Sequence, residues 1–430
     1  MLKKIITGMR NNREATNASW LIGGRIAQML LSFFVSILTA RYLGPSNYGV
    51  INYATAYVAF FTSMCTLGIN AVIIRDFVEY PQEQGTAIGT SIVLRTVSSF
   101  LSIILIFCVV SIVDQDEPTT IIVALLCSVS LLFQVMDTFN YWFQSRYESK
   151  VTSIATFAAY AATSLYRIIL LILQKDVMWF AFATSVDYIC LGLILWLSYR
   201  KHNGPKLRYS WSKGKYLLSR SYHYILSGMM VAIYGQTDRF MLKQMLDESS
   251  VGFYSLASSL SNMWVFVLQA IIDSMYPTII NLYGKDQKQF EKKNRQLYAI
   301  VIYVSIAVAA CFVIFAPLII RLLYGDAYLP AIGPLRIITW YTIFAFLGVA
   351  RNAWIVCENQ QKYLKYMYLS AAFINIVLNY FMIPLWGASG AALASLVTQV
   401  CTSLILPCFW KNMRTNVKLM IDALLLRDVF

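Results

Sequence analysis

Five arginines lie inside long apolar stretches of this sequence. They are Arg25, Arg95, Arg167, Arg220 and Arg351. An arginine at the centre of a bilayer costs about 2.5 to 3.5 kcal/mol on insertion scales, so such a residue seldom faces lipid. Guanidinium groups bind carboxylates and phosphate oxygens through paired N–H donors. These residues therefore suit the binding of an anion within a membrane, and we predict no catalytic residue among them.

The partners of these arginines decide between two interpretations. Carboxylates in the same apolar stretches could pair with them, namely Asp137, Asp187, Asp238 and Asp273. If each arginine pairs with an aspartate, the charges only fix helix positions. Arg25 and Arg220 also lie near predicted span ends, where a long side chain can reach water. The arginines are at least as numerous as these aspartates, which favours an anionic, phosphate-bearing ligand that enters from the cytoplasm.

The composition places these residues in membrane spans. Hydrophobic residues make up 58% of the chain and charged residues 13%, so water cannot be the main solvent. A span needs about 20 mainly apolar residues. The sequence predicts an all-α membrane protein with these twelve spans: 18–39, 49–71, 89–113, 119–142, 151–173, 177–199, 217–238, 250–275, 298–320, 332–355, 364–384 and 388–410.

The distribution of basic residues predicts the orientation. Lys and Arg gather in the N-terminal segment, in 200–215, in 285–295 and in 411–418, whereas 114–117 and 384–387 are acidic or uncharged. Because short cytoplasmic loops carry the excess of basic residues, both termini are predicted to be cytoplasmic. The net charge of +14 then reflects topology and not nucleic-acid binding. No cleaved signal peptide is expected, because the first span is too long and too polar.

A short internal repeat predicts two similar halves. At an offset of about 203 residues Gly49 aligns with Gly252, and Ser46 with Ser249, as internally repeated transporters lead one to expect. We predict two six-helix lobes, 1–199 and 217–430, joined by a basic cytoplasmic linker, 200–216. Polar residues recur at steps of three and four along several spans, which indicates a central lumen. Packing between helices is the alternative explanation for each single Ser or Thr.

The sequence gives little support for disulfide, metal or phosphate-loop chemistry. The eight cysteines fall mostly in apolar windows without a C-x-x-C pair, and the sequence holds only two histidines. Metal-hydrolysis and phosphate-loop motifs are missing, so we expect no metal and no cofactor. The connections are too short to form a soluble catalytic domain, which disfavours a membrane polymerase or glycosyltransferase.

Besides its twelve predicted spans, the chain contains the segments LTARYLGPSNYG, TDRFML followed by SSVGFYSLA, LYGDAYLPA and WGASGAALAS, in this order. In these features it resembles the Wzx-type bacterial polysaccharide flippases of the multidrug/oligosaccharidyl-lipid/polysaccharide exporter superfamily. It extends over essentially the whole chain. The motifs are more specific to the superfamily than to one substrate.

The resemblance implies a flippase that moves a polyprenyl-diphosphate-linked oligosaccharide across the bacterial inner membrane by alternating access, for O-antigen, capsule or a related polymer. It implies a cationic lumen, to which Arg25, Arg95, Arg167, Arg220 and Arg351 are assigned by position. It also implies a gating ion pair at Asp238 and Arg239. Coupling to H+ or Na+ is common in the superfamily, and the candidates here are Asp187 and Asp273. A polymerase and a chain-length regulator are the implied protein partners.

Two alternatives remain at this point. A drug or small-cation antiporter of the same superfamily would be expected to have an acidic lumen, so the arginines argue against it. A channel or a passive scramblase is harder to exclude from the sequence.

Overall fold

The computed structural model describes residues 13–428, and within this range the chain is helical with no β-strand. The chain forms two compact units. Unit 1 comprises the chain up to Leu43 and Val50–Ala232, and unit 2 comprises Gly44–Gly49 and Ile233–Phe430. The fold class predicted from the sequence, an all-α membrane protein with two lobes, is confirmed.

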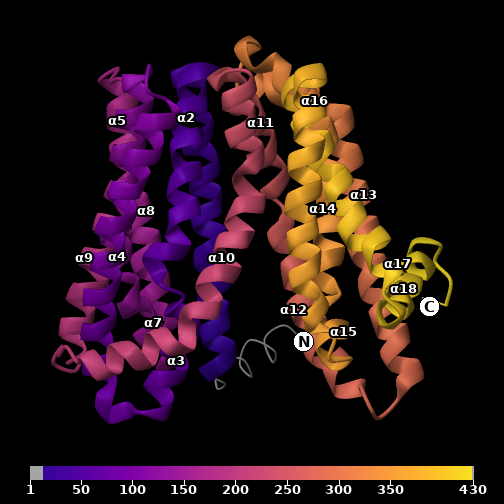
Figure 1. Ribbon diagram of the computed structural model, residues 1–430, viewed down its shortest axis with the longest axis horizontal. Helices are drawn as coiled ribbons and strands as arrows, with labels where there is room; N and C mark the ends of the chain where they lie inside the picture. The colour runs from indigo at the N-terminus through magenta and orange to yellow at the C-terminus, as the bar shows by residue number, and fades with distance from the viewer. Residues whose placement is uncertain (1–12, 429–430) are drawn as a thin grey trace, which may run out of the picture. The chain divides into compact units, whose positions relative to one another are not determined.

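Unit 1 is a helical bundle (Figure 1, indigo to magenta). Its elements are most of α2 (Arg13–Thr66), α3 (Asn70–Glu79), the 3-10 turn η1 (Pro81–Glu83), α4 (Gln84–Val113), α5 (Pro118–Ser128), α6 (Ser130–Gln134), α7 (Asp137–Ser145), α8 (Ser149–Ile172), α9 (Val177–Lys201) and the first two thirds of α10 (Trp211–Met245).

Unit 2 is a second bundle, in which α13 packs against α14 and α14 against α16. Its further elements are α11 (Glu248–Asn262), α12 (Val265–Leu282), α13 (Gln287–Leu323), η2 (Asp326–Ala331), α14 (Ile332–Ala350), α15 (Asn352–Cys357), η3 (Gln361–Tyr363), α16 (Leu364–Val400), the π-helix η4 (Cys401–Ile405), α17 (Leu406–Phe409), η5 (Lys411–Met413) and α18 (Arg414–Leu424).

Nine helical stretches within residues 13–428 are long and apolar enough to cross a membrane. Two of them, within α2 and α16, each contain two predicted spans. The predicted span 217–238 falls on α10, which is not among the nine. The predicted count of twelve spans is therefore not confirmed. α10 is long enough to cross a membrane, but it carries several charged and polar residues.

Glycines divide the two longest helical stretches. Gly44 in α2 has φ 72° and is followed by Pro45, and Gly387 in α16 has φ 57°. Both φ values lie in the left-handed region that only glycine enters without strain. The break at Gly387 lets the halves of α16 run back along each other as a hairpin.

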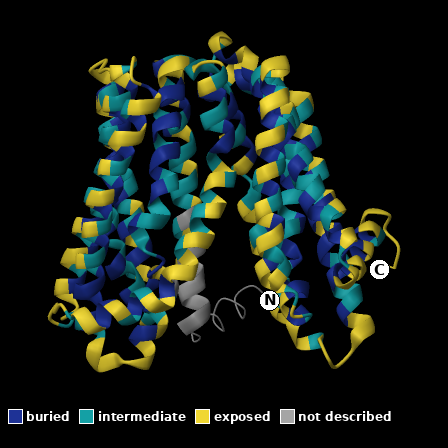
Figure 2. Cartoon of the chain, in the orientation of Figure 1, coloured by how far each residue is buried: buried dark blue, intermediate teal, exposed yellow. Residues whose placement is uncertain are grey.

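Each bundle has its own buried interior. Figure 2 shows buried residues along the inner faces of the helices and exposed residues on the outer faces. In unit 1 the core includes Phe77, Phe139 and Trp142, and the Trp142 ring N–H donates to Gln84 Oε1 at 2.9 Å. In unit 2 the core includes Leu297 and Trp354. Exposed apolar side chains are common in both units, as expected where lipid is the solvent.

The predicted linker 200–216 packs on unit 1 and does not separate the lobes. Arg208 N–H donates to Gly85 O at 3.2 Å, and Ser210 N–H donates to Thr90 Oγ1 at 3.0 Å. A Cβ at Gly89 would lie 2.4 Å from Arg208 O, so the absence of a side chain permits this contact. The division between units falls after Ala232, inside α10. The domain boundaries predicted from the sequence stay a prediction.

Lys213 forms ion pairs that hold the start of α10 to the bundle of unit 1. Its ammonium lies 2.9 Å from Asp76 Oδ1 and 2.9 Å from Glu83 Oε2. Burial lowers the pKa of Lys213, but the hydrogen bonds to Glu83 and Asp76 raise it by more, so the net shift is upward from 10.5. The resulting stabilisation is present below pH 10.5 and is lost as the pH rises through the folded-state pKa.

The repeated glycines meet in a reciprocal contact. A Cβ at Gly49 would lie 1.8 Å from Glu248 O, and a Cβ at Gly252 would lie 2.2 Å from Pro45 O. Pro45 and Glu248 are themselves related by the repeat offset. Gly44–Gly49 of the first copy therefore pack on the second copy within unit 2, and each glycine passes the backbone of the other copy.

We expect Gly252→Ala to destabilise the protein. The added methyl group would strike backbone, which cannot rotate away, and overpacking of this kind costs about 1 to 3 kcal/mol. The measurement is the melting temperature of the purified protein in detergent. Gly235→Ala is the control, because a Cβ there meets no atom within 4 Å. Equal melting temperatures for the two variants would contradict the contact.

Candidate functional site

A buried carboxylate, Asp238, forms the centre of a polar cluster in unit 2. It lies on α10 with 5% of its surface exposed. Its Oδ1 accepts from Asn375 Nδ2 at 3.1 Å and from Asn379 Nδ2 at 2.6 Å. Its Oδ2 accepts from Ser395 Oγ at 2.6 Å and from the Tyr254 hydroxyl. Four hydrogen bonds thus replace the water that the carboxylate loses on burial.

Three elements place these donors. Asn375 and Asn379 are one helical turn apart and therefore share a face of α16. Ser395 follows the break at Gly387, so the second half of the α16 hairpin returns it to the same level. Tyr254 comes from α11, whose first turn is capped by Asp247, which accepts from Ser250 N–H at 2.7 Å.

The cluster contains oxygen atoms that could hold a cation. All four donors to Asp238 are neutral, and among residues 13–428 no Lys, Arg or His forms an ion pair with it. Asn379 Oδ1 is buried without a hydrogen-bond partner. A carboxylate, an unsatisfied amide oxygen and two hydroxyl oxygens are hard ligands of the type that small cations bind. The residues present therefore fit a proton or a small monovalent cation.

A cavity of about 270 Å³ adjoins the cluster. It is lined mainly by polar side chains, including Tyr234, Arg239, Asn262 and Tyr341 besides Asp238 and Tyr254. Gln399 Nε2 donates to the Tyr234 hydroxyl at 2.7 Å and to the Tyr341 hydroxyl at 3.4 Å. The carboxylate thus faces a polar space within unit 2 and not a solid apolar core.

The gating ion pair predicted at Asp238 and Arg239 stays a prediction. Arg239 is half-buried beside the cavity, where its Nε donates to Ser255 Oγ at 3.0 Å and a terminal nitrogen donates to Gln236 Oε1. Neighbouring positions on one helix point in different directions, so the two side chains have separate partners. In this structure Asp238 is the residue at the centre of the cluster, and Arg239 lines its cavity.

Arg95 is buried inside unit 1. It is 1% exposed and donates to Gln134 O at 3.0 Å, to Val135 O at 3.5 Å and to Thr138 Oγ1 at 3.0 Å. These acceptors lie where α6 ends and α7 begins, so they include carbonyls that an unbroken helix would satisfy itself. Asp137 lies within electrostatic reach. These contacts favour a structural role for Arg95.

Arg351 has similar surroundings in unit 2. It is 6% exposed and lies between α14 and α15, where it donates to Thr402 O at 3.2 Å and Ser403 O at 3.4 Å. Both acceptors belong to the π-helix η4, whose wider turn changes the hydrogen bonding of the carbonyls. One terminal nitrogen of Arg351 therefore donates to a helix irregularity, while its Nε is buried without a hydrogen-bond partner.

The other predicted arginines are differently placed. Arg220 is exposed near the start of α10, with its guanidinium 5.1 Å from the centre of the Tyr216 ring. Arg167 is partly exposed on α8, within electrostatic reach of Asp187 on α9. The side chain of Arg25 lies outside the part of the chain that the structure describes. Among the four of these arginines whose side chains the structure describes, Arg220 is the most exposed.

The two predicted coupling carboxylates differ in burial. Asp187 is partly buried in unit 1 and accepts from Thr163 Oγ1 at 3.3 Å. Asp273 is exposed on α12 and accepts from Gln269 Nε2 at 2.8 Å. Asp273 thus lacks the enclosed, multiply bonded environment that surrounds Asp238.

The residues that complete the Asp238 cluster were missing from the sequence prediction. Asn375, Asn379, Ser395 and Tyr254 were not proposed as site residues. One signal was present, because two asparagines four residues apart in the apolar run FINIVLNY must share a helix face. Ser395 and Tyr254 carry no comparable signal, since only the tertiary fold brings them to the aspartate.

Two protein families match parts of this chain. Residues 15–283 match the family described as polysaccharide biosynthesis protein, and residues 224–381 match the MatE family. The capsular polysaccharide biosynthesis protein CapF of Staphylococcus aureus is 20% identical over 411 residues, which cover 92% of this chain and 99% of CapF.

Solved structures share the fold at low sequence identity. The lipid II flippase MurJ in an inward closed conformation has a TM-score of 0.75 and 14% identity, with 95% of this chain and 92% of that chain covered. An inward-facing multidrug resistance MATE family transporter of the MOP superfamily has a TM-score of 0.70 and 14% identity, with 90% and 94% covered. At these identities the similarity establishes the fold alone.

We expect Arg95→Ala to lower the melting temperature and Arg220→Ala to leave it nearly unchanged. Hydrogen bonds from charged groups contribute about 1.5 to 3 kcal/mol each, and Arg95→Ala leaves buried carbonyls unpaired. Arg220 is exposed and provides a matched control. Thermal unfolding of both variants in detergent measures the difference. An unchanged melting temperature for Arg95→Ala, with lost substrate binding, would instead assign Arg95 to the ligand.

Proposed function

The chain belongs to the polysaccharide biosynthesis protein family, and from this premise we propose that it flips a polyprenyl-diphosphate-linked oligosaccharide repeat unit from the cytoplasmic to the outer leaflet. The product would serve surface polysaccharide synthesis. The protein would act as a transporter in the bacterial inner membrane, with both termini in the cytoplasm. A polysaccharide polymerase and a chain-length regulator would be its partners.

The physical problem for such a protein is the head group. Moving a charged diphosphate and its sugars through hydrocarbon would strip them of water at a prohibitive cost. The polyprenyl tail can stay in lipid, so the protein needs to shelter only the head. Arg220 on unit 1 is our candidate for binding the diphosphate, with Arg167 and Arg25 as further candidates. Arg95 and Arg351 would support the helices that carry them.

The observation that carries the proposal is the Asp238 cluster. An ionisable residue enclosed among transmembrane helices is expensive, and such residues mark ion and substrate pathways. We assign to Asp238 the binding of a coupling cation, H+ or Na+, which would drive the protein through its cycle. This moves the proposed coupling site from Asp187 and Asp273 to a carboxylate with four donors and an adjoining polar cavity.

Occupation of Asp238 would have to change its hydrogen bonds. A protonated carboxyl group carries a donor of its own, so it cannot keep all four neutral donors in place. A bound Na+ would require oxygens, such as Asn379 Oδ1, where amide N–H groups now point. Arg239 on α10, Tyr254 on α11 and Tyr341 on α14 face the same space. In either case α10, α11 and α16 must adjust together, which links ion binding to conformation.

Flipping is testable directly. The purified protein is reconstituted into liposomes with a polyprenyl-diphosphate oligosaccharide, and a glycan-cleaving enzyme is added outside. We expect protein-dependent exposure of glycan that began in the inner leaflet. Protein-free liposomes give the background. Uptake of small organic cations without any glycan exposure would contradict the proposal and support a drug antiporter.

Asp238→Asn tests the coupling. The substitution keeps the shape but removes the charge, so we expect gradient-driven flipping to fall about tenfold or more, which corresponds to 1.4 kcal/mol or more. Rates are measured with an imposed Na+ gradient and, separately, a pH gradient, to identify the ion. Asp273→Asn is the control and should respond to the gradient like the wild type. Loss of the response in Asp273→Asn alone would return the coupling role to Asp273.

A further inference from the structure

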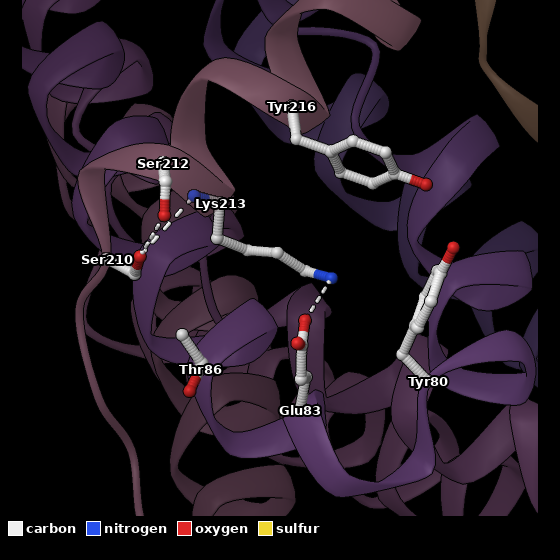
Figure 3. Close-up of a pocket in the computed structure, with 7 residues that line it drawn as sticks. All are labelled: Tyr80, Glu83, Thr86, Ser210, Ser212, Lys213 and Tyr216. Atoms are coloured by element: carbon white, nitrogen blue, oxygen red, sulfur yellow. Dashed lines mark hydrogen bonds and ion pairs between the residues drawn. The ribbon is translucent and has the colours of Figure 1, made fainter.

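A polar pocket of about 360 Å³ lies in unit 1, at the start of α10. Its lining residues are Tyr80, Glu83, Thr86, Ser210, Ser212, Lys213 and Tyr216. Figure 3 shows the Lys213 ammonium extending toward Glu83, between the two tyrosines, whose hydroxyl groups are directed into the same space. Nothing in the flipping or coupling steps above uses this pocket.

The walls of the pocket are held in place before any ligand binds. The loop before α10 is bonded to α4 through Gly85 and Thr90, as described above. Lys213 is 8% exposed and fixed by two carboxylates. Its ammonium also lies 4.9 Å from the centre of the Tyr80 ring and 5.1 Å from that of Tyr216. Preorganised groups bind a ligand without a further ordering cost.

Several hydrogen-bonding groups of the pocket lack protein partners. Among residues 13–428 no hydrogen bond is formed by the hydroxyls of Tyr80, Tyr216 and Thr86, or by Glu83 Oε1. The tyrosine and threonine hydroxyls can both donate and accept, and the carboxylate oxygen accepts. Tyr80 adds an aromatic surface that is 45% exposed. A ligand with many hydroxyl groups around a compact ring would satisfy this set.

The charges of the pocket argue against a phosphate. Glu83 and Lys213 are its charged lining residues, and they neutralise each other at 2.9 Å. Asp76, 2% exposed behind Lys213, takes a second N–H of the same ammonium. The ammonium is therefore committed, and an added anion would meet two carboxylates. A neutral ligand avoids this repulsion, whereas a uronic acid or a diphosphate does not.

From these features we propose that the pocket binds a neutral pyranose unit of the oligosaccharide before it is flipped. The inference rests on the proposed function. It also uses the predicted cytoplasmic location of 71–89 and 200–216, the side on which the lipid-linked sugar would be presented. Tyr80, Tyr216, Thr86 and Glu83 bind sugar hydroxyls, and Lys213 positions Glu83. The pocket thereby selects the sugar, while the diphosphate binds elsewhere.

Binding is tested with the full-length protein in nanodiscs by saturation-transfer difference NMR. The probes are N-acetylglucosamine, glucose and glucuronate. We expect saturation transfer to at least one neutral sugar and at least tenfold weaker binding of glucuronate. The double variant Tyr80→Phe/Tyr216→Phe, which removes only two hydroxyls, should weaken binding of the neutral sugar about tenfold. Tyr209→Phe, at an exposed tyrosine outside the pocket, is the matched control.

The outcomes separate this proposal from the proposed function. Absence of saturation transfer to both neutral sugars, or an equal loss of binding in Tyr209→Phe, would overturn the proposed sugar pocket even if the protein flips lipid-linked oligosaccharide. Sugar binding that depends on Tyr80 and Tyr216 would support the pocket even if liposome flipping fails. Where flipping occurs, the double variant should raise the half-saturating substrate concentration about tenfold. Unchanged melting temperatures exclude a folding defect.

Discussion

The reciprocal contact of Gly49 and Gly252 constrains the rest of the structure. Each glycine passes the backbone of the other copy of the motif so closely that a methyl group has no room. As a result, Gly44–Gly49 are counted with unit 2 although the flanking parts of α2 belong to unit 1. The left-handed Gly44 permits the chain to turn into this contact and out of it. The internal repeat thus has a physical meaning, because both copies need a glycine at the same register.

Three buried charges within the predicted spans, those of Arg95, Arg351 and Asp238, have two different kinds of partner. Arg95 and Arg351 donate to backbone carbonyls at irregular points of neighbouring helices, where the membrane offers no water to satisfy them. The guanidinium donates to carbonyls that the irregular backbone leaves unpaired, so each group lowers the free-energy cost of burying the other. Asp238 instead accepts from four neutral side chains and keeps an unsatisfied amide oxygen nearby. Arg95 and Arg351 each keep a buried Nε donor without a partner, whereas the Asp238 cluster leaves an unpaired acceptor, Asn379 Oδ1.

The sequence predicted what local patterns determine. Apolar windows defined the helices, and the repeated glycines indicated two halves. The boundary at 200–216 stays a prediction; the glycines of α4 admit the loop before α10, a contact that no local pattern reveals. Interior arginines were identified as unusual, but their partners depend on helix breaks in other spans. The asparagine pair of α16 was detectable, whereas its convergence with Tyr254 and Asp238 follows only from the α16 hairpin and the packing of α11.

The Asp238 cluster and the polar pocket at the start of α10 each lie within one unit, yet α10 contributes to both. Lys213 stands in its first turn and Asp238 lies 25 residues later, a separation of about 37 Å along a regular helix. A single helix of this kind is a continuous physical connection between two sites, and energetic coupling requires such an element with more than one arrangement. Lys213 holds the start of α10 to unit 1 through ion pairs with the buried Asp76 and the exposed Glu83, so this end of the helix is fixed within unit 1. The charged and polar residues that weaken α10 as an isolated membrane span include both Lys213 and Asp238.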